Sequence, residues 1–125
     1  MKELSRNPKF APKNVIDSIV IFRDKYRKSL MDVGKSPDCH IYDLDKKSLW
    51  FVKSGKGRRF ITSVITFYKE LDDELDQKIF ITEFLERGRH YPFWHYGVLE
   101  TPMYRQRLAT IYKKLDERFH LEVSA

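Results

Sequence analysis

Apolar residues recur at intervals of three and four through much of the chain, which is the spacing of helices that bury one face. The pattern predicts helices over residues 14–33, 59–71 and 73–87, with Gly34 and Gly88 as stops. The third helix carries apolar residues on more than one side, so we expect neighbouring helices to surround it. Asp72 or Asp73 should cap its start, where the helix dipole favours negative charge.

A fourth amphipathic pattern begins at residue 101 or 102. Thr101 can accept free amide protons as the N-cap, and Pro102 suits the next position because no amide donor is needed there. One stripe of this helix is apolar and should face the core: Tyr104, Leu108, Ile111, Tyr112, Leu115 and Phe119. The opposite stripe is polar or basic and should face outward: Met103, Gln106, Arg107, Thr110, Lys113 and Lys114.

An aromatic stretch, residues 91–96, comes just before this helix. A short helix over residues 92–98, followed by a turn over residues 97–100, would form a helix-turn-helix unit with it. Tyr91, Phe93, Trp94 and Tyr96 could stack on unpaired bases. We favour core filling, because buried ring area would clamp the short helix to its neighbours.

The segment 35–57 has the least regular pattern. Residues 41–44 and 49–52 predict either a short hairpin or a loop pinned by Trp50. Residues 53–59, KSGKGRR, superficially resemble a phosphate-binding loop but lack the G-x-x-x-x-G-K-[ST] spacing. We expect a basic linker close to a nucleic acid backbone instead.

The composition agrees with a helical domain. The 125 residues suffice for one core, and five Gly with five Pro are few for a loop-rich all-β protein. We therefore expect an all-α domain in which residues 1–57 form an N-terminal helix and linker, and residues 58–125 form the helix-turn-helix region, packed together. The formal charge of +6 favours association with nucleic acid.

The chain offers little for catalysis. The His and Cys residues lack the spacing of a metal site, and no nucleophile motif is present. We expect no enzyme activity, no cofactor and no metal.

Cys39 is the only cysteine, and no stretch has the length of a signal peptide core or a membrane span. These features predict a cytoplasmic protein with no membrane partner.

Charge is unevenly distributed along the C-terminal half. Residues 69–87 hold seven acidic and three basic residues, a net charge of −4, whereas residues 89–118 hold three acidic and six basic residues, a net charge of +3. Because phosphate would repel the acidic segment, we expect that segment to face away from DNA, toward a protein partner.

The order of segments from about Arg59 to Phe119 resembles the sigma-factor region 4-like proteins, most closely the phage transcriptional regulators of the ArpU and RinA type and related small mollicute proteins. The resemblance covers roughly half the chain. It rests on the acidic LDDELDQKIFITEFLERG segment, the aromatic turn and the TPMYRQRLATIYKKL helix. Family membership implies transcriptional regulation through binding of promoter or operator DNA.

We therefore expect a regulator that binds double-stranded DNA. Gln106 and Arg107 would read base edges in the major groove. The expected DNA-binding residues are Thr101, Met103, Arg105, Gln106, Arg107, Thr110, Lys113 and Lys114, with Arg58 and Arg59 as outer phosphate contacts. A homodimer would suit a symmetric DNA target, with helix 15–30 packing either within its own chain or against a second copy.

Two alternatives stay open. The fold could be an interaction module that docks on RNA polymerase or another regulator through residues 72–76 and the Trp94 region. It could also bind single strands or RNA by stacking bases on Tyr91, Trp94 and Tyr96.

Overall fold

The computed structural model of the chain describes residues 13–44, 55–86, 94–97 and 99–121. Within these ranges every regular element is a helix, so the all-α prediction is confirmed. The α-helices are α2 (Lys13–Asp32), α3 (Gly55–Glu70), α4 (Glu74–Ile79) and α5 (Thr101–Phe119). The shorter elements are the 3-10 helices η1 (Ile41–Asp43) and η4 (Trp94–Gly97) and the π-helix η3 (Phe80–Leu85).

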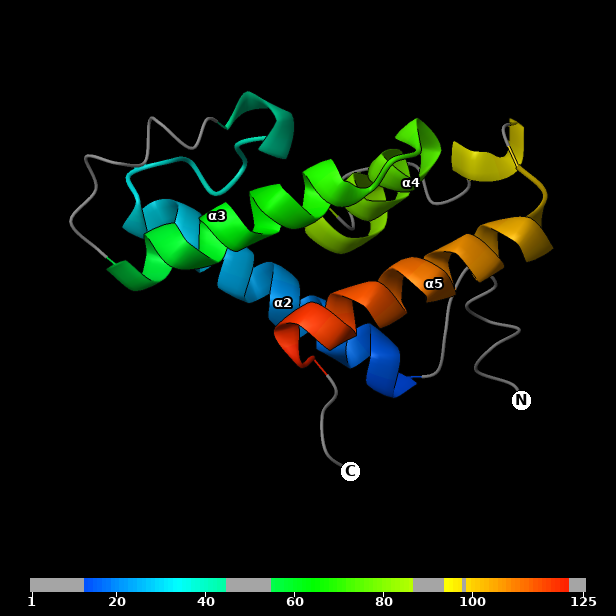
Figure 1. Ribbon diagram of the computed structural model, residues 1–125, viewed down its shortest axis with the longest axis horizontal. Helices are drawn as coiled ribbons and strands as arrows, with labels where there is room; N and C mark the ends of the chain where they lie inside the picture. The colour runs from blue at the N-terminus through cyan, green and yellow to red at the C-terminus, as the bar shows by residue number, and fades with distance from the viewer. Residues whose placement is uncertain (1–12, 45–54, 87–93, 98, 122–125) are drawn as a thin grey trace.

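Helices α2 and α3 form the main helix pair (Figure 1). The apolar face of α2 is buried within its own chain, where Ile19, Phe22 and Leu30 belong to the core. Gly57 marks a close approach of the two helices, because a Cβ atom there would lie 3.0 Å from the Cβ of Asp32 and 3.4 Å from the carbonyl oxygen of Ser29. A second copy of the chain is therefore not needed to cover this face of α2.

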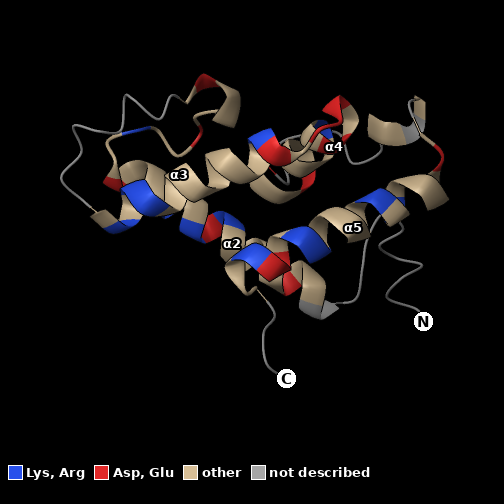
Figure 2. Cartoon of the chain, in the orientation of Figure 1, with Lys and Arg blue, Asp and Glu red and all other residues tan. Residues whose placement is uncertain are grey.

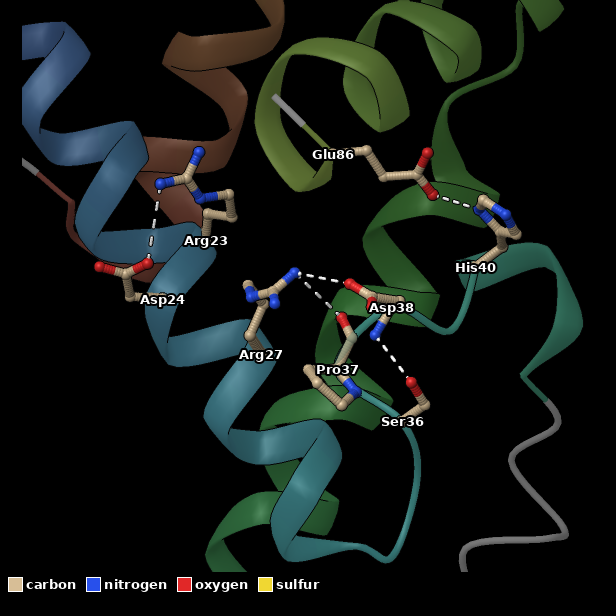
Figure 3. Close-up of polar contacts among 8 residues, drawn as sticks. All are labelled: Arg23, Asp24, Arg27, Ser36, Pro37, Asp38, His40 and Glu86. Carbon is tan, nitrogen blue, oxygen red and sulfur yellow. Dashed lines mark hydrogen bonds and ion pairs between the residues drawn. The ribbon is translucent and has the colours of Figure 1, made fainter. Parts of the chain in front are cut away.

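The chain leaves α2 at Gly34, as predicted. Gly34 has φ of 81°, a left-handed conformation that glycine adopts without steric cost. Arg27 then ties the next turn back to α2, because its Nη1 donates to Asp38 Oδ1 at 3.1 Å and to the carbonyl oxygen of Pro37 at 3.4 Å (Figure 3). The amide of Asp38 donates to Ser36 Oγ at 3.1 Å, which closes the turn.

The hairpin prediction for residues 41–44 is wrong, because Ile41–Asp43 form the 3-10 helix η1 and no strand. Residues 49–52, including Trp50, lie outside the described residues. Ile41 and Leu44 are buried in the core, so this segment is held by apolar packing. His40 also bonds the buried carboxylate of Glu86, which joins the segment to the end of η3 (Figure 3).

Helices α4 and η3 follow each other without a break and together correspond to the helix predicted over residues 73–87. Asp73 is the N-cap of α4, and its carboxylate accepts a hydrogen bond from the amide of Leu75 at 2.7 Å. At Phe80 the helix changes to π geometry, in which hydrogen bonds span five residues. The amide of Glu86 accordingly donates to the carbonyl oxygen of Ile81 at 2.8 Å.

The widened turn of η3 allows opposite sides to be buried at once. Phe80 and Phe84 point into the aromatic core, whereas Glu83 is buried against other elements. The expectation that neighbours surround this segment is therefore confirmed.

One core contains side chains from every α-helix among the described residues. Phe119 at the end of α5 lies 5.3 Å from the ring of Phe22 on α2 and 5.6 Å from that of Phe60 on α3, centroid to centroid. The expected boundary between residues 57 and 58 falls inside α3, which begins at Gly55, four residues before the predicted start. The first half and the second half of the chain thus share their packing.

Candidate nucleic-acid interface

Helix α5 presents one buried face and one exposed face, as the sequence pattern predicts. Tyr104, Leu108, Ile111 and Leu115 are between 0% and 3% exposed. The helix begins at Thr101, within the predicted start, but Thr101 is its first residue and Glu100 occupies the N-cap position. The expected N-cap role of Thr101 is therefore wrong, and the side chain of Glu100 makes no capping hydrogen bond.

The exposed face carries the residue types that the DNA-binding hypothesis requires. Its exposed members are Met103, Arg105, Gln106, Thr110, Lys113 and Lys114. Thr110 Oγ1 donates to the carbonyl oxygen of Gln106 at 3.0 Å, which leaves the hydroxyl oxygen able to accept. Within the described part of the chain, no ion pair engages Arg105, Lys113 or Lys114.

Arg107 differs from its neighbours, because its guanidinium is held by acidic residues. Its Nη1 lies 3.0 Å from Asp76 Oδ1 and 3.1 Å from Asp73 Oδ2, both at the start of α4. The pKa of Asp73 is lowered by the hydrogen bond from the Leu75 amide and by Arg107. Hydrogen bonds to Asp73 and Asp76 raise the pKa of Arg107 in return.

This arrangement brings the start of the acidic segment, which we expected to face away from DNA, next to the helix expected to bind DNA. Figure 2 shows acidic residues at the start of α4, beside α5. Arg118 repeats the pattern near the other end of α5, where it pairs with Glu70 at the end of α3. The two oppositely charged segments therefore pair with each other along one edge of α5.

The segment before α5 is anchored by a buried polar cluster. Glu83 on η3 is 2% exposed, accepts a hydrogen bond from the hydroxyl of Tyr104 and lies 3.4 Å from Trp94 Nε1, which donates to it. The imidazole of His95, 1% exposed, stacks on the Tyr104 ring with centroids 3.8 Å apart. Trp94 and His95 therefore pack as part of the core.

Of the helix predicted over residues 92–98, the structure describes residues 94–97. These residues form the 3-10 helix η4, and residues 92, 93 and 98 lie outside the described residues. The amide of Leu99 donates to the carbonyl oxygen of His95 at 2.9 Å and so guides the chain into α5. Tyr91, also expected in the aromatic cluster, lies outside the described residues as well.

The two remaining predicted residues, Arg58 and Arg59, lie in the first turns of α3. Arg59 is exposed and lines a hollow together with Arg118 and Phe119, so it lies near the C-terminal end of α5. Arg58 is half-buried and interacts within the chain. The structure thus brings Arg59 close to the end of α5 and not to Gln106.

Sequence reasoning missed the partners of Arg107 and the buried carboxylate of Glu83. The opposite net charges of residues 69–87 and 89–118 were a signal for the first. The burial of Glu83 was not predicted, because a carboxylate is seldom buried without a partner, and its partners Trp94 and Tyr104 come from a distant part of the chain.

None of the helices among the described residues is both long and apolar enough to cross a membrane. The same residues contain no group of three His, Cys, Asp or Glu side chains that could hold a metal ion.

Comparison with models of protein families, with curated proteins and with solved structures finds no match to this chain.

Proposed function

We propose that this protein is a transcriptional regulator that binds double-stranded DNA through the outward face of α5. The observation that carries the proposal is the exposure of Gln106 and Thr110 between the cations Arg105, Lys113 and Lys114, on a helix whose other face is buried. With 19 residues, α5 is about 28 Å long, and the major groove of B-DNA is wide enough to admit it.

Each group on this face has a distinct role in the proposed complex. The side-chain amide of Gln106 can donate to N7 of adenine and accept from the exocyclic amine of the same base. This pairing distinguishes one base pair from the others. Arg105, Lys113 and Lys114 neutralise phosphates and fix the position of the helix on the duplex. These contacts to phosphate supply affinity but no sequence preference.

Arg107 is less available for base recognition than Gln106, because it is already paired. Its guanidinium has to leave Asp73 and Asp76 before it can pair with guanine. We therefore assign base recognition first to Gln106. Arg107 holds the start of α4 against α5 and so orients the binding face.

A second candidate function is docking on RNA polymerase or another regulator without DNA contact. The observation that favours it is the acidic start of α4, where Asp72, Asp73 and Glu74 are exposed beside α5. Carboxylates at this edge repel phosphate and would attract a basic protein surface. Salt-resistant capture of purified polymerase, with no retardation of duplex DNA, would favour this function.

Single-strand binding by stacking on Trp94 receives less support. Lys78 Nζ lies 5.1 Å from the centroid of the Trp94 ring, and the ring also packs edge to face with Tyr104 at 5.8 Å. Its indole N–H is directed to Glu83. These contacts occupy the ring that would have to accept a base.

Selection of bound sequences from random duplex DNA tests the proposal. Gln106→Ala should then lose about 1–3 kcal/mol of discrimination at one base position. Lys113→Ala should weaken binding to all sequences alike and reduce the slope of log K against log salt concentration by about 1. Electrophoretic mobility shift at several salt concentrations measures both effects.

Lys28→Ala is the matched control, because Lys28 is an exposed lysine on α2 and carries the same charge. It should leave affinity and salt dependence close to those of the parent protein. The proposal fails if no duplex is retarded at low salt, or if Gln106→Ala and Lys113→Ala bind the selected site as the parent does.

A further inference from the structure

A basic hollow lies where α2, α3 and the end of α5 meet. It has a volume of about 380 Å³ and is lined by Lys25, Lys56, Arg59, Phe60, Ser63, Arg118 and Phe119. This volume lies within the range of sites that bind small molecules. Three different helices therefore contribute to one depression of ligand size.

The described walls of the basic hollow carry charge of one sign. Of the seven described residues that line it, four are cations and none is acidic. Arg118 is paired with Glu70, but among the residues described no ion pair engages Lys25, Lys56 or Arg59. Since like charges repel, an anion placed between these side chains would stabilise their arrangement.

The first turn of α3 adds to this positive potential. The N-terminus of a helix carries partial positive charge and unpaired amide groups, which favour an anion. The first turn of α3 holds no acidic residue, and Lys56, Arg58 and Arg59 follow in its first five positions. Cations at this end oppose the helix dipole, so a bound anion would offset both the dipole and the lysine and arginine charges.

The floor of the basic hollow is apolar. The rings of Phe60 and Phe119 pack edge to face with their centroids 5.6 Å apart. Lys25 Nζ lies 4.6 Å from the centroid of the Phe60 ring, so it stands over the floor. An anion that also carries a flat or apolar group could use the cations and the rings together.

The basic hollow is distinct from the face of α5 that we assign to DNA. Phe119 lies about 140° around the helix axis from Gln106, so a duplex centred on Gln106 would not cover it. The site is also no phosphate-binding loop, because its cations come from three helices and the loop spacing is absent.

We propose that the basic hollow binds the phosphate groups of a small phosphorylated ligand of the nucleoside diphosphate class. More than one phosphate is favoured because the four cations come from three helices around the hollow. The Phe60 and Phe119 rings would contact the base or sugar, and Ser63 could donate to a phosphate oxygen.

Calorimetric titration of the full chain with ADP, pyrophosphate and adenosine, at constant ionic strength, tests this proposal. ADP and pyrophosphate should bind with 1:1 stoichiometry, and adenosine should bind far more weakly. The double variant Lys25→Ala/Arg59→Ala should weaken ADP binding about tenfold or more, because it removes two charge-assisted contacts. The control variant Arg105→Ala/Lys113→Ala removes the same charge from the outward face of α5 and should keep the parent affinity for ADP.

Equal loss of ADP binding in both double variants would overturn the proposal, since it would show a response to net charge alone. No binding of ADP or pyrophosphate at millimolar concentration would overturn it as well.

Duplex retardation is measured on the same variants. If Lys25→Ala/Arg59→Ala weakens duplex binding while the parent fails to bind ADP, the basic hollow is a contact for the nucleic acid backbone instead. The DNA-binding proposal is judged separately by Gln106→Ala and Lys113→Ala.

Discussion

Arg107 on α5 joins Asp73 and Asp76 at the start of α4, with nitrogen to oxygen distances of 3.1 Å and 3.0 Å. Asp73 is at the same time the N-cap of α4, so one carboxylate both begins a helix and binds its neighbour. The contact fixes the start of α4 beside the outward face of α5. It also gives Nη1 of the Arg107 guanidinium two acidic partners within its own chain.

Releasing Arg107 should strengthen binding to DNA. In Asp73→Asn/Asp76→Asn the arginine loses both charged partners and two negative charges leave the edge of α5. We expect a gain of about 1 kcal/mol in duplex affinity at low salt, which should shrink as salt is raised. Asparagine is also a good N-cap, so α4 should keep its start. Mobility shift at two salt concentrations measures the gain.

Asp24→Asn/Asp32→Asn is the control for this prediction, since both residues are exposed on α2 and the change in net charge is the same. A similar gain in the control would show that net charge alone is responsible. An unchanged affinity in Asp73→Asn/Asp76→Asn would contradict the idea that Arg107 is withheld from DNA.

Asp73 should make stability depend on pH at the acid end. The Leu75 amide and Arg107 lower its pKa in the folded state below the ordinary value of 3.8. The carboxylate therefore stabilises the fold above about pH 4, and this contribution is lost as pH falls through the lowered pKa. Thermal unfolding from pH 7 to pH 3 should show a smaller acid-induced drop in Tm for Asp73→Asn than for the parent. Parallel curves for the two proteins would contradict this prediction.

Two buried tyrosines should respond oppositely to loss of the hydroxyl group. Tyr26 is 2% exposed, and its hydroxyl has no hydrogen-bond partner among the described residues. Burial raises its pKa, so the hydroxyl stays neutral and protonated. Tyr26→Phe should leave the free energy of unfolding unchanged or raise it by up to about 1 kcal/mol, because a buried unpaired polar group is removed.

Tyr104→Phe is the matched comparison. It deletes the hydroxyl that donates to the buried carboxylate of Glu83, so we expect a loss of about 1–3 kcal/mol. Chemical denaturation of the two variants measures both values. Equal losses would show that the two hydroxyls have the same surroundings, contrary to the structure.

Gly57 should be essential for the contact of α2 with α3. A methyl group there would meet the Asp32 Cβ at 3.0 Å and a backbone oxygen at 3.4 Å, neither of which can move away alone. Gly57→Ala should therefore cost about 1–2 kcal/mol, although alanine favours helix. Gly55→Ala is the control, because its methyl group would meet only the flexible end of Arg59. Stability equal to or above that of the parent is expected for Gly55→Ala, as judged by denaturant unfolding.

Periodicity was sufficient to place the faces of α2 and α5. Their stripes follow the 3.6-residue repeat without interruption, so Leu108 and Ile111 could be assigned to the core from spacing alone. Arg107 was harder, because it lies at the edge of the outward stripe. A helical wheel gives the direction of a side chain but not which neighbouring helix lies there.

Other features were beyond the reach of sequence patterns. Ile41 and Leu44 are buried, but a run this short has the same apolar content whether it is a strand or a 3-10 turn. The basic hollow unites Lys25, Arg59 and Arg118 from distant positions in the chain, so only tertiary packing brings them together.

The π geometry of η3 makes the chain sensitive to its own length. Deleting one residue between Phe80 and Leu85 would let ordinary α-helical bonding take over, because the π turn holds one residue more than an α-helical turn. Glu83 and Phe84 could then no longer reach Tyr104 and the aromatic core at once.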